Sequence, residues 1–177
     1  MKSPIKCIGI ELEGGWHEDP ERIARENLTP EEQALVRVGT DGSVSVPGAD
    51  WNREVRIGPV PFVKGNWQHI VETMWPDIAN KTCGMHMHVS FRNMRHYQLL
   101  ADSVAFSGYL HEQLWEFQRR NFKFNNSRLA VRLRGENQYC HTNGDAWKQL
   151  AGEQDRYKSI NWCAFSSHGT LEVRVLP

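Results

Sequence analysis

Four short segments of the chain alternate polar and apolar residues, and this pattern constrains the fold more than any other feature. They read IGIELEG at 8–14, REVRIGP at 53–59, CGMHMHVSF at 83–91 and TLEVRVLP at 170–177. Side chains at positions i and i+2 of a β-strand share one face. The pattern therefore predicts strands of a half-buried sheet, whose polar face carries Glu, His and Arg side chains but no Lys.

The polar positions of these segments form four pairs. They are Glu11 with Glu13, Glu54 with Arg56, His86 with His88, and Glu172 with Arg174. Two carboxylates on one face repel each other, and a divalent cation relieves the repulsion. A solvent-facing strand edge is the alternative for the Glu pair, and a cross-strand salt bridge is the alternative for each Glu–Arg pair. The His pair also occurs in zinc hydrolases, but the other six histidines form no second ligand motif.

Composition narrows the class of partner. Lys plus Arg number 21, as do Asp plus Glu, so the net charge gives no argument for binding to nucleic acid or to a membrane. No apolar run approaches the ~20 residues of a membrane-spanning helix. Four widely spaced cysteines without a CxxC motif predict reduced thiols and a cytoplasmic protein. We expect the basic stretch at 119–134 to contact nucleotide phosphates or to be solvated.

The remaining sequence predicts one α+β domain over residues 1–177. Strands are expected at 5–13, ending at Gly14-Gly15, at 53–57, at 85–91 and at the C-terminus. The turn dipeptide Asp41-Gly42 predicts a hairpin that pairs 36–38 with 44–46. Helices are expected at 29–36, where Thr29 and Glu32 would form a capping box, and at 67–78, 94–119, 145–150 and 153–160.

The motifs occur in an order that resembles the glutamine synthetase-like carboxylate–amine ligases, in particular the compact amidoligases of phages and bacteria. The order is ExE at 11–13, DGS at 41–43, an acidic strand at 54–56, GMHxHxS at 84–90, RLRGENQYC at 132–140, DRYKSIN at 155–161 and ExR at 172–174. The resemblance implies a curved, mainly antiparallel sheet with helices on its convex side. The active site would then lie on the concave face.

The resemblance also implies roles for individual residues, with ATP as co-substrate and two or three Mg²⁺ or Mn²⁺ ions. The implied metal ligands are Glu11, Glu13, Glu54, His86 and Glu172. The implied contacts to nucleotide, phosphates or substrate are His88, Arg56, Arg156, Asn161 and one of Arg128, Arg132 or Arg134. Asp41, Glu54 and Arg174 would be catalytic, with Asp41 near the amine as a candidate base.

The implied reaction forms an amide bond through an acyl phosphate, which an amine attacks after ATP has phosphorylated a carboxylate. The substrates would be a small carboxylate and amine, or groups on a peptide or macromolecule. The chain stops three residues after Arg174, where related amidoligases usually continue, which leaves a homo-oligomer open. One alternative is a metal-dependent hydrolase or nuclease that uses the ExE and HxH pairs. Another is a degenerate, non-catalytic member that binds a nucleotide or a protein.

Overall fold

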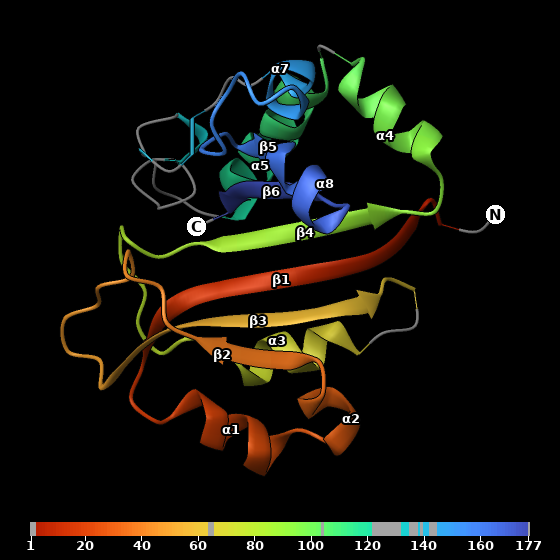
Figure 1. The fold of residues 1–177 in the computed structure, drawn as a ribbon. Coiled ribbons are helices and arrows are strands. Elements are labelled where there is room, and N and C mark those ends of the chain that lie inside the picture. Colours follow the sequence, from red (N-terminus) through yellow and green to blue (C-terminus); the bar gives the residue numbers. More distant parts are fainter. Residues whose placement is uncertain are drawn as a thin grey trace. The chain divides into compact units, whose positions relative to one another are not determined.

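The computed structural model describes residues 3–63, 66–103, 105–121, 132–134, 138, 140–141 and 145–176. The chain divides into two compact units, Ser3–Met87 and His88–Pro177. The described residues form six strands and seven helices, which confirms the α+β class (Figure 1). None of these helices has the length and apolar character needed to cross a membrane. The glutamine synthetase-like curvature and the single-domain organisation stay predictions.

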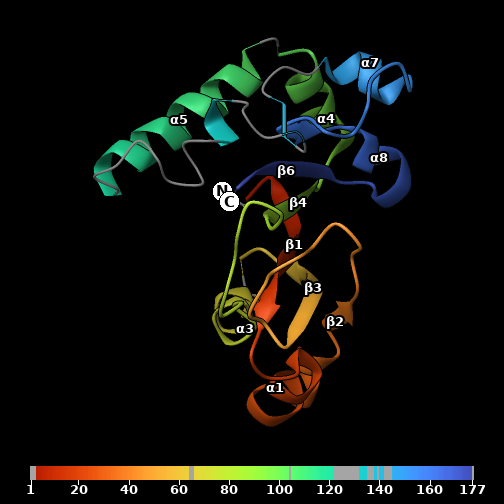
Figure 2. The same ribbon diagram turned by 90° about the vertical axis from the view of Figure 1, so that its left-hand side faces the viewer.

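The first unit is built on strands in the order β2-β3-β1-β4. These are β1 (Ile5–Trp16), β2 (Val36–Gly39), β3 (Trp51–Pro61) and the first residues of β4 (Met85–Phe91). Strand β3 is antiparallel to both β1 and β2. Helices α1 (Pro20–Asn27) and α2 (Pro30–Gln33) connect β1 to β2, and α3 (Trp67–Thr73) follows β3. Figure 2 shows α3 beside one face of β1 and β3.

One face of these strands forms the core of the first unit. The buried side chains are Ile8, Ile10 and Leu12 of β1, Val55, Ile57 and Val60 of β3, Ala24 of α1, and Ile70 with Met74 at α3. Because side chains alternate along a strand, the polar residues between them lie on the opposite face. The alternation in the sequence predicts this division, and β4 begins and ends where it was expected.

Strand β1 continues through Gly14 and Gly15, so the predicted end at these glycines is wrong. A Cβ atom on Gly14 would lie 2.4 Å from the Cβ of Pro76. On Gly15 it would lie 2.4 Å from the Cβ of Ala49. The glycines therefore allow other segments to pack directly against the strand.

Strand β3 also extends past its predicted end at Ile57. Ile8 pairs with Val60 and Ile10 with Ile57, so β3 has one more residue than β1 between these pairs. Gly58 lies in this bulge with a φ of +110°, a conformation that favours glycine. The extra residue returns Val60 to the buried face.

The predicted hairpin between 36–38 and 44–46 is wrong. Strand β2 pairs with β3, where Val38 lies opposite Val55. Val44 and Val46 lie outside any strand and are buried beside Cys83. The Asp41-Gly42 turn exists, but it belongs to the connection 40–50 between β2 and β3.

The second unit contains the rest of β4, with β6 (Leu171–Leu176) and β5 (Ile160–Asn161) in the order β4-β6-β5. Strands β5 and β6 are antiparallel. Its helices are α4 (Met94–Ala101), α5 (Phe106–Asn121), α7 (Ala146–Leu150) and α8 (Cys163–His168). Tyr97, Ile160, Trp162 and Leu171 form its buried core.

Several predicted helices differ from those observed. The helix expected at 94–119 is two helices, because α4 ends at Ala101 and α5 begins at Phe106. The helix expected at 153–160 is absent, since Lys158 forms a bridge with His141 and β5 begins at Ile160. Helices α2 and α3 are shorter than predicted. The capping box of α2 and the helix after Asp145 are confirmed.

Candidate functional site

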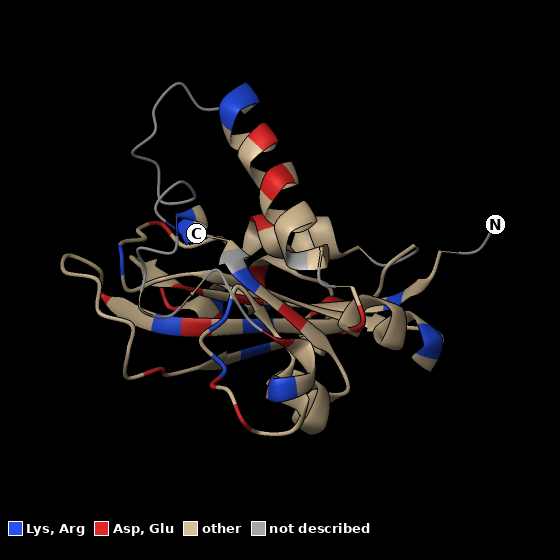
Figure 3. Cartoon of the chain, turned by 90° about the horizontal axis from the view of Figure 1, so that it is seen from above, with Lys and Arg blue, Asp and Glu red and all other residues tan. Residues whose placement is uncertain are grey.

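Two rows of residues cross β2, β3 and β1 on the face opposite the core of the first unit. The register places Arg37, Arg56 and Glu11 in one row. It places Gly39, Glu54 and Glu13 in the next row. We call these residues the polar face of the first unit. Figure 3 shows acidic and basic residues interspersed along the strands, without a block of one sign.

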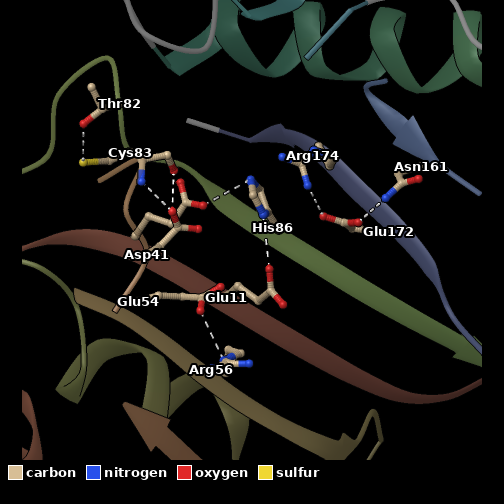
Figure 4. Close-up of polar contacts among 12 residues, drawn as sticks. Glu11, Asp41, Glu54, Arg56, Thr82, Cys83, His86, Asn161, Glu172 and Arg174 are labelled. Atoms are coloured by element: carbon tan, nitrogen blue, oxygen red, sulfur yellow. Dashed lines mark hydrogen bonds and ion pairs between the residues drawn. The ribbon is translucent and has the colours of Figure 1, made fainter. Parts of the chain in front are cut away.

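His86 on β4 contacts both carboxylates of β1. Its Nδ1 lies 3.2 Å from Oε2 of Glu11, and its Nε2 lies 4.0 Å from Oε1 of Glu13. The contact with Glu11 is drawn in Figure 4. The position of β4 is fixed in part by a hydrogen bond from the backbone N–H of Glu13 to the carbonyl of Gly84. Only 4% of His86 is exposed, so this imidazole lies buried between two carboxylates.

Glu54 lies next to these groups on β3. Its Oε2 lies 3.3 Å from Nε of Arg56. Burial raises the pKa of Glu54, and repulsion from Glu11, Asp41 and Glu13 raises it further, while Arg56 acts in the opposite direction. Glu54 is therefore a half-buried carboxylate with three other carboxylates close enough to repel it. A bound cation would relieve that repulsion.

Asp41 reaches this environment from the connection 40–50. Its Oδ1 accepts a hydrogen bond of 2.7 Å from the backbone N–H of Ser43. The connection is anchored to the segment before β4, since the backbone N–H of Ser45 donates to Thr82 and Asn80 donates to the carbonyl of Ser45. These contacts give Asp41 a defined position near the polar face of the first unit.

Glu172 is the centre of a buried polar network in the second unit. Its Oε1 accepts a hydrogen bond of 2.7 Å from Nη1 of Arg174. Its Oε2 accepts a hydrogen bond of 2.5 Å from Nδ2 of Asn161 (Figure 4). All three residues are buried, with Glu172 only 4% exposed. The carboxylate is therefore charge-compensated and held in place by its own unit.

Further cationic groups surround this network. Nη1 of Arg132 donates to the carbonyl of Arg174 at 3.0 Å. The guanidinium groups of Arg156 and Arg174 lie 5.3 and 5.8 Å from the ring centroid of Tyr157. Arg134 is exposed, and Arg128 lies outside the described residues. The structure thus gathers Arg132, Arg156 and Arg174 within the second unit, where the sequence predicts phosphate contacts.

The two histidines of the HxH motif have different surroundings. His86 contacts the carboxylates of β1, as described above. His88 belongs to the second unit, where its Nδ1 lies 2.9 Å from Oγ1 of Thr170 and its ring meets that of His168 edge-on. A shared strand face therefore does not give the two imidazoles a shared environment.

Two polar residues, Arg37 and His111, are not among the predicted site residues but make specific contacts in the structure. Arg37 lies opposite Arg56, and the alternation Val36-Arg37-Val38 was a signal for its position. Nε2 of His111 lies 2.8 Å from Oγ of Ser159. Burial lowers the pKa of this histidine, and a hydrogen bond with the Leu133 backbone acts in the opposite direction. No short motif marks that pair, since its members are 48 positions apart.

An apolar cavity of about 160 Å³ lies in the second unit. It is lined by Met94, Tyr97, Gln98, Ala101, Trp147, Leu150, Trp162 and Phe165. None of the predicted site residues lines it. Tyr97 directs its hydroxyl to the carbonyl of Gly169, so this polar group serves the fold.

Comparison with known proteins gives no relative of this chain. No family model, curated protein or solved structure matches it. The fold defines the chain as an α+β protein. It has a carboxylate–histidine group in one unit and a buried Glu–Arg–Asn network in the other. The roles implied by the resemblance stay predictions.

Proposed function

We propose that the protein is an ATP- and divalent-metal-dependent ligase that joins a carboxylate to an amine through an acyl phosphate. One observation supports this proposal most. The buried imidazole of His86 lies against Glu11 and Glu13, beside Glu54, whose pKa is raised by burial and by the neighbouring carboxylates. Such a group favours a bound cation, and the order of the sequence motifs favours the ligase class.

The donor atoms of this group fit Mg²⁺ or Mn²⁺. Carboxylate oxygens are the preferred ligands of these ions, and an imidazole nitrogen is acceptable to Mn²⁺. Glu11, Glu13, Glu54 and His86 would hold the ions, which when bound would neutralise phosphoryl oxygens. Glu172 is the further ligand that the resemblance implies.

The arginines of the second unit would bind phosphate oxygens. Arg174 is the main candidate, because Glu172 holds its Nη1 in one orientation. An oriented guanidinium matches the forked geometry in which arginine binds phosphate oxygens. Arg132 and Arg156 would add positive charge, and Asn161 and His88 would contact nucleotide or substrate.

The amine must lose a proton before or as it attacks the acyl group, so a ligase of this kind needs a base. Asp41 is the candidate, since it lies close enough to raise the pKa of Glu54 and is held by Ser43. A carboxylate in this position can accept the proton directly or through one water molecule. No protein nucleophile is required for this route.

A metal-dependent hydrolase is the second candidate function. One observation favours it: Glu11, Glu13 and His86, which lie against one another, all belong to the first unit. They would activate a water molecule without the arginines of the second unit. The hydrolase differs from the ligase in needing no ATP.

ADP release tests the proposal. The purified chain is incubated with ATP, Mg²⁺ or Mn²⁺, and pools of carboxylates and amines. Wild type is compared with Glu11→Gln and with Glu26→Gln, a control at an exposed position of α1. We expect ADP only with metal and with particular pools, unchanged in the control and reduced more than about 100-fold in Glu11→Gln.

Normal ATP turnover by Glu11→Gln would contradict the assignment of the metal site. Turnover of a substrate without ATP would favour the hydrolase instead. An amide product that appears in equal amount with ADP would identify the ligase reaction and its two substrates.

A further inference from the structure

The apolar cavity of the second unit is open to solvent at its rim. Two of the residues that line it, Met94 of α4 and Trp147 of α7, are 55% and 52% exposed. Deeper walls come from Tyr97 and Trp162, which are buried, and from Phe165. Large apolar side chains that border a hollow and contact water favour an apolar group that covers them. The cavity can therefore receive a molecule from solution.

Hydrogen bonds hold two of the aromatic walls in place. The hydroxyl of Tyr97 donates to the carbonyl of Gly169 at 2.9 Å, and its ring centroid lies 4.9 Å from that of Phe165. The indole N–H of Trp147 donates to Oδ1 of Asp102 at 3.1 Å, which ties α7 to the end of α4. Because the polar atoms of both side chains are bonded within the unit, Tyr97 and Trp147 line the cavity with the apolar surfaces of their rings.

The size and charge of the cavity restrict its occupant. Its volume is about 160 Å³, and an apolar cavity of about 150 Å³ binds benzene. All eight lining residues are uncharged, so an ion that entered would lose water without gaining an opposite charge. Four of the eight are aromatic, namely Tyr97, Trp147, Trp162 and Phe165. Aromatic walls favour another aromatic ring, through edge-to-face or offset contacts.

We propose that this cavity binds one neutral aromatic ring of a small molecule, a compound of the phenol type. The ring would lie among the aromatic walls. Its hydroxyl would meet Gln98, an exposed lining residue whose amide both donates and accepts hydrogen bonds. None of the residues assigned to metal or phosphate in the proposed ligase lines the cavity, so this site does not rest on the proposed function.

NMR titration of the ¹⁵N-labelled chain with phenol tests the proposal. The indole N–H signals are followed, and each is assigned from its absence in a variant without that tryptophan. We expect the signals of Trp147 and Trp162 to shift saturably. Trp75 is the internal control, since it is 52% exposed like Trp147 but does not line the cavity. Its signal should not move.

Two matched pairs of variants locate the binding. Trp147→Ala should weaken phenol binding roughly tenfold, as contacts between aromatic rings contribute up to this much, and Trp75→Ala should bind like wild type. On α4, Met94→Ala should weaken binding a few-fold, because its thioether borders the ring. Leu99→Ala should not, since Leu99 is 57% exposed but lies outside the lining.

Two further ligands test the chemistry of the occupant. Cyclohexanol has the size and the hydroxyl of phenol but no aromatic ring, and benzoate has the ring with a negative charge. We expect cyclohexanol to bind roughly threefold more weakly than phenol, and benzoate roughly tenfold more weakly. Equal affinity of wild type for phenol and for either of these ligands would overturn the assignment of a neutral aromatic occupant.

Several other results would overturn the proposal. They are a shift that does not saturate, equal shifts of Trp75 and Trp147, and unchanged affinity in Trp147→Ala. Sedimentation provides another: a dimer that Trp147→Ala dissociates and Trp75→Ala does not would show that a second copy covers the cavity. If circular dichroism shows that Trp147→Ala does not fold, Met94→Ala and its control decide. Phenol binding needs no ATP, so this proposal and the proposed ligase can fail independently.

Discussion

The polar face of the first unit and the polar network of the second unit use the same residue types in opposite ways. Around Glu172, each carboxylate oxygen accepts a hydrogen bond from a residue of its own unit. Around His86, Glu11 and Glu13 approach one imidazole, and burial together with repulsion from neighbouring carboxylates raises the pKa of Glu54. Charge is balanced locally in the second unit and concentrated in the first.

This difference separates two physical roles. A carboxylate that is buried and fully hydrogen-bonded stabilises its unit and holds its partners in fixed orientations. A group of carboxylates that repel one another destabilises the empty protein and favours a bound proton or cation. We therefore expect the second unit to supply orientation and the first unit to supply the affinity for metal.

The largest expected effect is on folding stability. Glu172→Gln removes the carboxylate from Arg174, and breaking a buried ion pair costs about 3–5 kcal/mol of unfolding free energy. Glu11→Gln removes a repelling charge and should change stability by less than about 1 kcal/mol. Urea titration measures both, with Glu153→Gln at an exposed position as control. Equal losses of unfolding free energy in Glu172→Gln and Glu11→Gln would contradict the different roles assigned to the two units.

The next effect is stabilisation by metal. Mn²⁺ or Mg²⁺ at about 100 times its dissociation constant should stabilise the wild-type chain by roughly 2.7 kcal/mol, seen as a higher melting temperature. His86→Ala should lose most of this gain, because it removes a proposed ligand. His88→Ala is the matched control, since its imidazole contacts Thr170 in the second unit instead. Comparable losses in both variants would contradict the placement of the metal at Glu11 and His86.

A third effect depends on pH. The folded state raises the pKa of Glu54, so it binds this proton more tightly than the unfolded state does. This proton binding stabilises the folded state fully at pH values below the pKa of Glu54 in the unfolded state. The stabilisation is lost as the pH rises through the pKa of Glu54 in the folded state. Glu54→Gln should therefore gain stability relative to wild type as pH rises from about 4 to about 7. Urea titrations across this range measure the gain, and a difference that does not vary with pH would reject the cause assigned to the shift.

Metal binding gives a second test of the raised pKa of Glu54. Because the cation favours the charged carboxylate, its affinity for wild type should rise over the pH range in which Glu54 loses its proton. Proton release on Mn²⁺ binding can be followed in weakly buffered solution. Release that persists undiminished in Glu54→Gln would assign it to another group.

The smallest expected effect concerns Gly39. In Gly39→Ala the new Cβ would displace the Arg56 guanidinium, whose Nη2 lies 2.9 Å from that point. The Arg56 side chain is flexible and can shift, so the free energy of unfolding should fall by less than about 1 kcal/mol. Urea titration measures this change, and Gly42→Ala is the control because nothing lies within 4 Å of its Cβ position. An equal change in the control would show that the geometry at residue 39 is irrelevant.

Local alternation explains why much of the fold was predictable. The period of two at 8–14, 53–59, 83–91 and 170–177 depends only on neighbouring residues, and strands occur at all four places. The capping box of Thr29 and Glu32 is likewise a local signal, and it is confirmed. The pairing of strands depends on distant residues. Val38 therefore pairs with Val55 across the connection 40–50, where the turn at Asp41 had predicted a closer partner.

Glycines gave the least reliable local signal. Gly14 and Gly15 predict a strand end because glycine is flexible. The strand continues through both glycines, and Pro76 and Ala49 pack against it where side chains at positions 14 and 15 would otherwise lie. Local sequence signals also fail to reveal the contacts that distant residues make in the site. The sequence places polar residues on one face of each strand. It does not show that Glu172 would be compensated by Asn161, eleven positions away.

The most direct test of the account is a measurement of Mn²⁺ binding by electron paramagnetic resonance, on wild type, Glu11→Gln and Glu26→Gln. The account predicts saturable binding to wild type and to the exposed control, and loss of this binding in Glu11→Gln. Saturable binding of equal affinity in Glu11→Gln, or no saturable binding to wild type, would contradict the central claim that the polar face of the first unit binds a divalent cation.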